Sequence, residues 1–314
     1  MVLLKIARYE KRNLAHDNRL AKLIEVEIED QPTYNPFETA QPTPPQIPVS
    51  IAPTPNNPPW NGWTAVGVWA LSVAFIVVIP VIFLGLYAAS RGITLSDREQ
   101  FKEFIFTDQG AIVSQLLPIL LAHFLTIAVA WAVVTRFNTY GFRKTLGWKK
   151  GGFRWWHYCI ILGGFLVVAT IVTAYFPEQE NELIRLLKSS RTAVYIVAFF
   201  ATFTAPLVEE VVYRGILYSA FQRTFGTPAA FILATALFSI VHVPQYWPSY
   251  STIFLLTLLS LTLTAIRVKT NNLLPCIILH TLFNGLQSVL LILEPYLISP
   301  EVPNPIGTFC RMLK

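Results

Sequence analysis

Charged side chains are scarce in this chain of 314 residues. Only 13% of its residues are Asp, Glu, Lys or Arg, whereas 54% are hydrophobic. Since a soluble domain carries about 25% charged residues, this scarcity argues against a soluble protein and predicts an integral membrane protein. The net charge of +6 is then explained by basic cytoplasmic loops, and we expect no nucleic-acid partner.

Cysteine and the common metal-binding motifs are also scarce or absent. The three cysteines, Cys159, Cys276 and Cys310, are too few and too widely spaced for a disulfide framework. The sequence contains no CxxC pair, which argues against thiolate metal chemistry, and no HExxH motif. An early apolar core is missing as well, so we expect no cleaved signal peptide.

Proline divides the chain into regions. Residues 1–31 mix charged and apolar residues at helical spacing and predict an amphipathic N-terminal segment that lies on the membrane surface. Residues 32–59 hold ten prolines and predict an extended linker, because such a stretch cannot form a packed core. The membrane domain is expected to cover residues 60–314.

Long apolar runs dominate the membrane domain. A membrane-spanning helix needs about 20 residues, and seven runs approach or exceed this length. We therefore predict an all-α fold, a polytopic integral membrane bundle of seven or eight transmembrane helices. The short fifth and sixth runs are expected to extend to Trp247 and Tyr250, and the long fourth run to tilt or to bend near Pro206. The runs cover residues 64–89, 111–135, 157–176, 193–221, 229–243, 251–266 and 273–293.

Lys and Arg residues predict the orientation in the membrane. With the N-terminus in the cytoplasm, the cytoplasmic segments hold fifteen Lys and Arg residues and the opposite side holds eight. The connection 136–156 contributes most, because it holds six basic residues and no acidic one. Since cytoplasmic loops of membrane proteins are enriched in basic residues, we expect a multi-pass protein with a cytoplasmic N-terminus.

Two adjacent glutamates lie within the fourth apolar run, where charged groups are costly and usually functional. Glu210 and Arg214 are four residues apart, with the acid first, which is the favourable order for an ion pair on one helical face. We interpret them as a structural ion pair. Glu209 has no basic residue three or four positions further on. It is the unpaired acid and hence a candidate general base or acid.

Histidines supply the other ionisable groups at membrane depth. His242 follows Phe238 by one helical turn, and His280 shares a helical face with Asn284. Each pattern alone is also typical of ordinary polar contacts between helices. Together with Glu209, however, they place polar groups from three different runs in the same half-to-middle zone of the membrane. His123, close to Pro118 in the second run, is interpreted as a structural hydrogen-bonding residue.

These motifs resemble those of a known family. Glu209-Glu210-x-x-x-Arg214, Phe238-x-x-x-His242 and His280-x-x-x-Asn284, in this order on hydrophobic segments, are similar to the three motifs of the CPBP family of intramembrane proteases. That family includes type II CAAX prenyl proteases, bacteriocin-processing and self-immunity (Abi) proteins, and proteins like lysostaphin resistance protein A. The resemblance covers a core of about residues 193–293.

The resemblance implies an all-helical membrane endopeptidase that acts on a membrane-associated protein or peptide. Glu209 with His242 would activate the attacking water, and His280 with Asn284 would stabilise the oxyanion of the tetrahedral intermediate. Glu210 and Arg214 would hold the site together. A metalloprotease is the alternative, in which Glu209, His242 and His280 would be the three protein ligands of a catalytic zinc. The expected cofactor is therefore none or zinc.

Two functions of other classes stay open. A membrane scaffold or bacteriocin-immunity protein would use the polar cluster only for binding. A transporter is also compatible with intramembrane Glu and His, although the sequence shows no inverted repeat. The four residues Glu209, His242, His280 and Asn284 favour the enzyme, because a scaffold would not need all of them.

Overall fold

The computed structural model describes residues 52–94, 96–151 and 153–297. These residues belong to one compact unit that begins at Ala52. The predicted amphipathic segment 1–31 and linker residues 32–51 lie outside the described residues. Of the residues described, 81% are helical and none belongs to a β-strand, which confirms the predicted all-α fold.

Seven spans in the described part of the chain are long and apolar enough to cross a membrane, which confirms the predicted polytopic bundle. As expected, the fifth span extends to Tyr246 and the sixth begins at Tyr250. In chain order the spans are α2 (Gly62–Ser90), α4 (Gln109–Leu116) with α5 (Ile119–Thr135), α7 (Trp155–Tyr175), a composite fourth span (Arg191–Phe225), α12 (Thr227–Tyr246), α13 (Tyr250–Thr270) and α14 (Leu274–Leu297).

The fourth span changes its helical register twice. Two π-helical segments, η1 and η2, interrupt the α-helix on either side of the two glutamates, and η1 ends two residues before Pro206. Such π-helical insertions are rare and are frequently found at functional sites. The bend predicted near Pro206 thus takes the form of a register change. The five parts are α9 (Arg191–Phe199), η1 (Phe200–Thr204), α10 (Ala205–Glu210), η2 (Val211–Leu217) and α11 (Tyr218–Phe225).

Three short helices in the connections were not predicted: α3 (Arg98–Thr107), α6 (Phe142–Leu146) and α8 (Glu182–Ser189). Asp97 and Asn181 begin two of them, since their side chains accept hydrogen bonds from the backbone N–H groups of Gln100 and Ile184. The hydropathy of these segments is too low to mark them as spans. Their helices therefore depend on end caps and on one apolar face.

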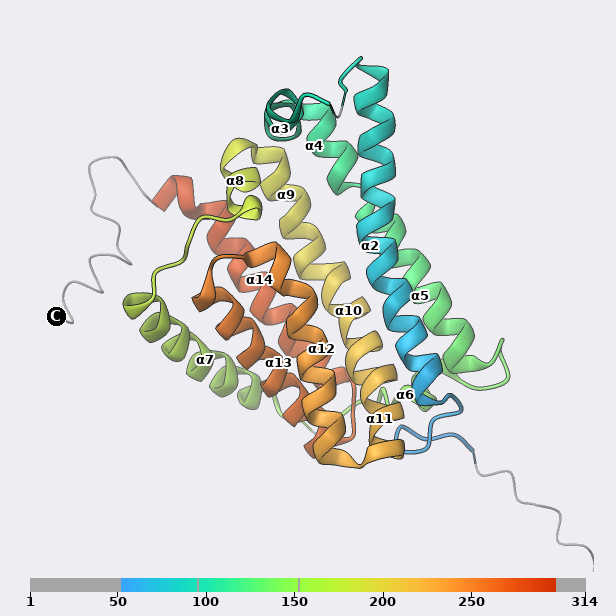
Figure 1. Ribbon diagram of the computed structural model, residues 1–314. Helices are drawn as coiled ribbons and strands as arrows, with labels where there is room; N and C mark the ends of the chain where they lie inside the picture. Colours follow the sequence, from blue (N-terminus) through green and yellow to red (C-terminus); the bar gives the residue numbers. More distant parts are fainter. Residues whose placement is uncertain (1–51, 95, 152, 298–314) are drawn as a thin grey trace, which may run out of the picture. The chain divides into compact units, whose positions relative to one another are not determined.

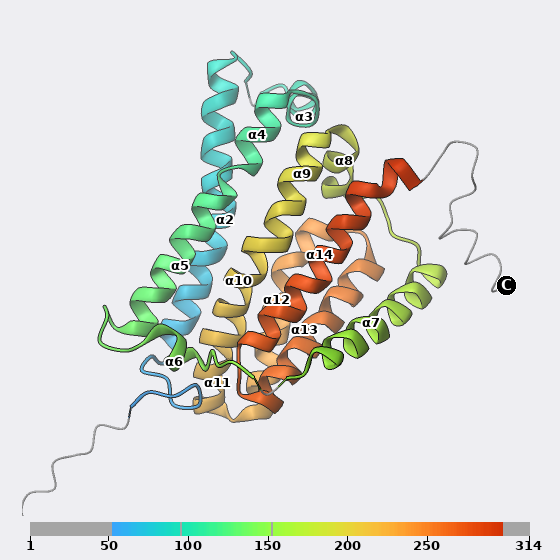
Figure 2. The ribbon, with the colours of Figure 1, turned by 180° about the vertical axis from the view of Figure 1, so that it is seen from behind.

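The composite fourth span occupies the centre of the bundle. Figures 1 and 2 show α2 and α5 side by side on one side of it, and α12, α13 and α14 on the other, with α7 beyond α13 and α14. Segment η2 contacts both α2 and α12, and α10 contacts α5 and α14. Every residue from Glu210 to Phe221 is buried. The helix that carries the two glutamates is therefore held by both groups of helices.

The described end of the predicted linker packs against the membrane domain. Pro55 and Pro58 are buried. Arg223 donates a hydrogen bond to the carbonyl oxygen of Pro58, and Arg136 donates one to that of Pro59. The Trp60 indole N–H donates to the carbonyl oxygen of Ile216 at 3.1 Å. The packed domain therefore begins before Trp60, because Arg136 and Arg223 donate hydrogen bonds to the carbonyl groups of this proline segment.

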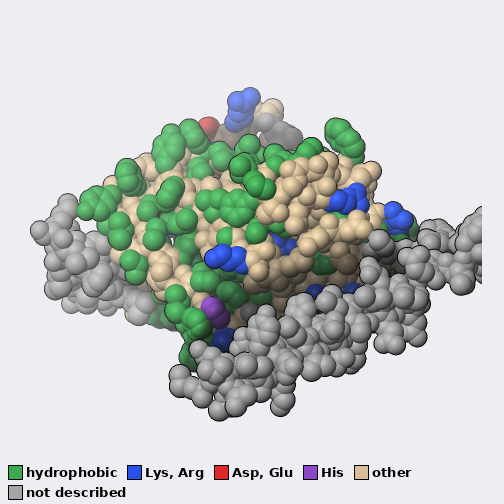
Figure 3. All heavy atoms as spheres, turned by 90° about the horizontal axis from the view of Figure 1, so that it is seen from below, with side chains coloured by type: hydrophobic (Ala, Val, Ile, Leu, Met, Phe, Trp, Pro, Cys, Tyr) green, Lys and Arg blue, Asp and Glu red, His purple; other side chains and the backbone are tan. Residues whose placement is uncertain are grey.

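Charge is distributed unequally between the two ends of the bundle. The connections at the end of α6 and α11 contain Lys and Arg but no described acidic residue, and Figure 3 shows several basic side chains on this face. All described acidic residues outside the fourth span belong to the connections and helix ends at the opposite end. They are Asp97, Glu99, Glu103, Asp108, Glu178, Glu180, Glu182 and Glu294.

Candidate active site

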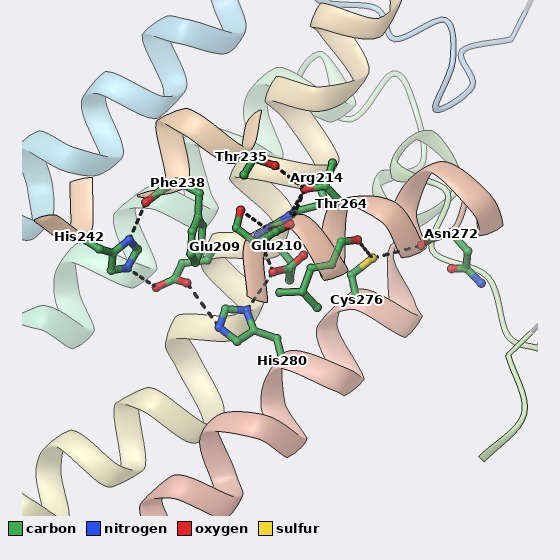
Figure 4. Close-up of polar contacts among 12 residues, drawn as sticks. Glu209, Glu210, Arg214, Thr235, Phe238, His242, Thr264, Asn272, Cys276 and His280 are labelled. Atoms are coloured by element: carbon green, nitrogen blue, oxygen red, sulfur yellow. Dashed lines mark hydrogen bonds and ion pairs between the residues drawn. The ribbon is translucent and has the colours of Figure 1, made fainter. Parts of the chain in front are cut away.

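Three spans contribute the polar side chains of the candidate site. Glu209 and Glu210 end α10, His242 lies in the last turns of α12, and His280 lies in the second turn of α14. Figure 4 shows Glu209 between the two imidazole rings, while Glu210 points away from Glu209 toward Arg214. The structure therefore brings together Glu209, His242 and His280, which are distant in the sequence.

The predicted contact between Glu210 and Arg214 is present and completely buried. Arg214 Nη1 lies 2.9 Å from Glu210 Oε1, and neither side chain is exposed. The other guanidinium nitrogens donate to α13: Nη2 to the carbonyl and hydroxyl oxygens of Ser260, and Nε to the hydroxyl oxygen of Thr264. A buried ion pair requires additional hydrogen bonds to offset its loss of water. Helix α13 supplies these hydrogen bonds to Arg214.

Glu210 has a second partner that the sequence analysis did not identify. His280 Nδ1 lies 2.9 Å from Glu210 Oε1, the same oxygen that binds Arg214. A carboxylate accepts hydrogen bonds, so His280 donates through Nδ1–H. This contact orients the ring and turns Nε2 toward Glu209, whose Oε2 lies 3.7 Å away. Glu210 therefore connects the arginine to one of the two histidines beside Glu209.

The ring of His242 is oriented by its own helix. Its Nδ1 lies 2.7 Å from the carbonyl oxygen of Phe238. Because a carbonyl oxygen can only accept, Nδ1 carries the hydrogen, and Nε2 of the neutral ring has a free lone pair. His242 Nε2 faces Glu209 Oε1 at 4.0 Å. This nitrogen is thus available to accept a proton or to bind a metal.

Phe238 lies between Arg214 and His242. Its ring lies 4.7 Å from Arg214 Cζ, and its centroid lies 4.6 Å from that of His242. A guanidinium over an aromatic face is stabilised by the quadrupole of the ring. Phe238 therefore packs against the cation on one side and fixes the position of His242 on the other.

Glu209 is the accessible acid of the site. Its side chain is 23% exposed and that of His242 is 18% exposed, whereas that of His280 is only 3% exposed. Among the described residues no Lys or Arg forms an ion pair with Glu209, and the two histidine nitrogens are too distant for direct hydrogen bonds. Both distances allow one water molecule of about 2.8 Å hydrogen-bond length to reach Glu209 and a histidine together.

Asn284 and His123 lie outside this cluster. Asn284 Nδ2 donates to the carbonyl oxygen of Ala201 in η1 at 2.9 Å, and no described hydrogen bond joins Asn284 to Glu209, His242 or His280. His123 Nδ1 lies 2.8 Å from the hydroxyl oxygen of Thr204, also in η1. Both residues therefore contact the π-helical segment that precedes the glutamates.

The three side chains that would bind a zinc ion, Glu209, His242 and His280, are spaced more widely than zinc ligands are. Ligands of a tetrahedral zinc at about 2.1 Å lie roughly 3.4 Å from one another. The distances from Glu209 to His242 and His280 are 4.0 and 3.7 Å, and the described part of the chain has no group of three His, Cys, Asp or Glu side chains placed to hold a metal ion. The donor set as arranged does not fit a zinc ion.

Three residues of the site were not identified from the sequence, because they are not ionisable. Ser260, Thr264 and the carbonyl oxygen of Ala201 bind Arg214 and Asn284. Ser260 and Thr264 are four residues apart on an apolar helix, and this spacing of hydroxyl groups is the one signal that could have predicted a polar partner. The role of the Ala201 carbonyl depends on the π-helical register, which the sequence pattern did not reveal.

Comparison with known proteins agrees with the motifs. Residues 191–286 match a family model described as type II CAAX prenyl endopeptidase Rce1-like, and this range contains every residue of the three motifs. The resemblance to the CPBP family is thus confirmed over these residues. Neither the curated proteins nor the solved structures yielded a match to the chain.

Proposed function

We propose that this protein is an intramembrane endopeptidase that hydrolyses a peptide bond of a membrane-associated protein or peptide, with Glu209 and His242 activating the water. The Rce1-like domain supports a membrane protease of the CAAX-protease-like kind in general. The observation that carries the proposal is the environment of Glu209. It is the one glutamate of the pair without an Arg or Lys partner among the described residues, and the Nε2 atoms of both histidines face it.

The proposed reaction begins with a water molecule held between Glu209 and His242 Nε2. As the water oxygen bonds to the peptide carbonyl carbon, its proton passes to Glu209. The oxyanion that forms lies near His280, which can donate only through Nε2 and only when doubly protonated, because Nδ1–H is bound to Glu210. Glu209 then returns the proton to the amine as the C–N bond breaks, and a carboxylic acid and an amine result.

Asn284 belongs to the same proposal in the role that the family resemblance implies. Its Nδ2 carries a second hydrogen besides the one that it donates to Ala201. That hydrogen is available to the oxyanion. Glu210 and Arg214 do not react in this scheme. They hold His280 and the three spans in place.

The orientation is proposed from the distribution of charge. Because basic residues are retained on the cytoplasmic side, the end of α6 and α11 is cytoplasmic, and so is the chain that enters there at Ala52. The described residues at this end include no acidic side chain, which supports a cytoplasmic N-terminus.

Cleavage of a quenched peptide library by detergent-purified protein tests the proposal. We expect the wild type to cleave the peptides. Glu209→Ala and His242→Ala should each lower the cleavage rate by at least about 100-fold. Glu294→Ala is the matched control, because this exposed glutamate lies at the far end of α14, and it should cleave normally. Equal cleavage by wild type and Glu209→Ala would end the protease interpretation and favour the scaffold, immunity or transport alternatives.

The metal alternative is separated by chelation. Both histidines donate Nδ1–H to an oxygen, as zinc-binding histidines do, although the distances from their Nε2 atoms to Glu209 do not fit a zinc ion. The proposed glutamate mechanism predicts unchanged cleavage after treatment with a chelator. Loss of cleavage that added zinc restores would replace it with a metalloprotease mechanism.

A further inference from the structure

The π-helical segment η1 leaves one carbonyl group without a donor from its own helix. Its hydrogen bonds join residues five apart, since the N–H of Ala205 donates to the carbonyl oxygen of Phe200. In this register the next pair would join residue 206 to the carbonyl oxygen of Ala201. Residue 206 is proline, which has no N–H group. The Ala201 carbonyl therefore needs a partner from elsewhere, because water is scarce at membrane depth.

Asn284 supplies that partner from another span. Its Nδ2 lies 2.9 Å from the Ala201 oxygen. One turn further along α14, Ser288 accepts a hydrogen bond from Thr202 at 3.0 Å and donates to the Ala198 carbonyl at 3.3 Å. Between them, Gly285 permits a close approach, because an added Cβ would lie 3.4 Å from the Thr202 methyl group. The two spans are thus joined side by side at η1.

This contact lies next to the candidate site, on the two spans that carry His280 and Glu209. Asn284 is one turn beyond His280 on α14, and Ala201 precedes Glu209 by eight residues on the fourth span. The register of η1 determines the direction in which Glu209 projects. A hydrogen bond that holds η1 against α14 therefore also holds Glu209 at 3.7 Å from His280.

We propose that Asn284 is a positioning residue, which fixes the direction of Glu209 by giving the Ala201 carbonyl the hydrogen bond that Pro206 cannot give. This inference rests on the proposed function, because the glutamate that it positions is the proposed base. This role uses the hydrogen that Asn284 donates to Ala201 and is additional to a contact of the second hydrogen with the oxyanion, which would not depend on residue 206. Residue 206 therefore separates the two roles.

The test is a double-mutant cycle between positions 284 and 206, with kcat and KM measured on the same cleaved peptide. Asn284→Ala should lower kcat about 10-fold to 100-fold and change KM less than about threefold. Pro206→Ala restores an N–H at the position where the Ala201 carbonyl needs one. In that background Asn284→Ala should cost at least about fivefold less in kcat than with proline at position 206, because only the contact with the oxyanion is then lost. An equal cost in both backgrounds would overturn the inference and leave the oxyanion role.

Ser288→Ala is the matched control for this cycle. It removes the neighbouring hydrogen bonds to Thr202 and Ala198 but does not touch Ala201. Its effect on kcat should be the same with proline or alanine at position 206. Rescue of Ser288→Ala by Pro206→Ala would show that the substitution stabilises the interface in general, and would also overturn the inference.

Folding and the proposed function are checked separately. Asn284→Leu, which fills a similar volume without a donor, repeats the cycle if Asn284→Ala unfolds, and recovery of a folded protein by Pro206→Ala counts as the same rescue. The thermal unfolding midpoints of the wild type, the two single variants and the double variant measure the coupling without a cleavage assay. Coupled midpoints in a chain that cleaves nothing would contradict the proposed function, whereas cleavage without coupling at position 206 would contradict the positioning role.

Discussion

The two adjacent glutamates experience opposite surroundings, although one peptide bond separates them. Glu210 is completely buried, binds Arg214 and His280 through one oxygen, and lies in a network of fixed donors. Glu209 is partly exposed, and the Nε2 atoms of two histidines face it at 3.7 and 4.0 Å. Adjacent residues on a helix differ in direction by about 100°, and this rotation places one acid in the core and the other at the reacting position.

At this scale we predict that neutralising the two acids has separable effects. Glu210→Gln leaves the Arg214 cation buried without a counter-charge and should lower the free energy of unfolding by about 3 kcal/mol. Glu209→Gln breaks no ion pair with Lys or Arg and should change it by less than about 0.5 kcal/mol, while cleavage is lost. Unfolding in detergent and peptide cleavage measure the two effects. Equal destabilisation by both substitutions would contradict the assignment.

The hydrogen bonds from Arg214 to α13 give a second prediction. Thr264→Val keeps the shape of the side chain but removes the hydroxyl oxygen that accepts from Arg214 Nε, so it should destabilise the fold by about 1–3 kcal/mol. Thr257→Val, on the same helix, removes a hydroxyl that bonds only to the carbonyl of Ile253 in its own helix. It is the control and should have a much smaller effect on the unfolding midpoint.

Among the elements, the long spans were predicted to within a few residues and the register changes were not. Span limits follow from hydropathy, which each residue carries by itself, so α12 and α13 extend close to the expected Trp247 and Tyr250. Segments η1 and η2 depend on Pro206 and on contacts with other spans, which no local pattern contains. The pair of Glu210 and Arg214 was predictable from its spacing. The contact between Glu210 and His280 was not, because it joins residues 70 positions apart.

The packing of Gly147, which follows α6, against Asn271, which follows α13, gives a prediction at the scale of elements. Gly147 has a φ of +72°, and an added Cβ would lie 2.5 Å from Pro55 and 2.9 Å from the Asn271 carbonyl oxygen. Gly226 has a similar φ of +81° but no atom within 4 Å of that position. Gly147→Ala should therefore lower the unfolding midpoint more than Gly226→Ala, which carries only the backbone strain. The reverse order would contradict the packing of residues 52–59 against Gly147.

For the whole molecule, the unequal charge of the two ends predicts its topology. In a variant from which the native cysteines are removed, a cysteine at Lys150 should react with an impermeant thiol reagent only from the cytoplasmic side. A cysteine at Lys102, in α3 at the other end of the bundle, should react only from the opposite side. Labelling of sealed vesicles of known orientation measures both. The opposite pattern would invert the topology.

The two π-helical segments also have a consequence for insertions and deletions. Each holds more residues per turn than an α-helix, so deletion of one residue from η1 can be absorbed by a return to regular α-helix. Such a deletion would preserve the hydropathy, the length and the fold of the span. Four α-helical residues turn the chain by about 400°, about as much as the π-helical turn of five residues that they would replace, so Glu209 would still face His242 and His280. A deletion in the regular helix α9 cannot be absorbed in this way and would rotate the segments on either side by about 100° relative to each other.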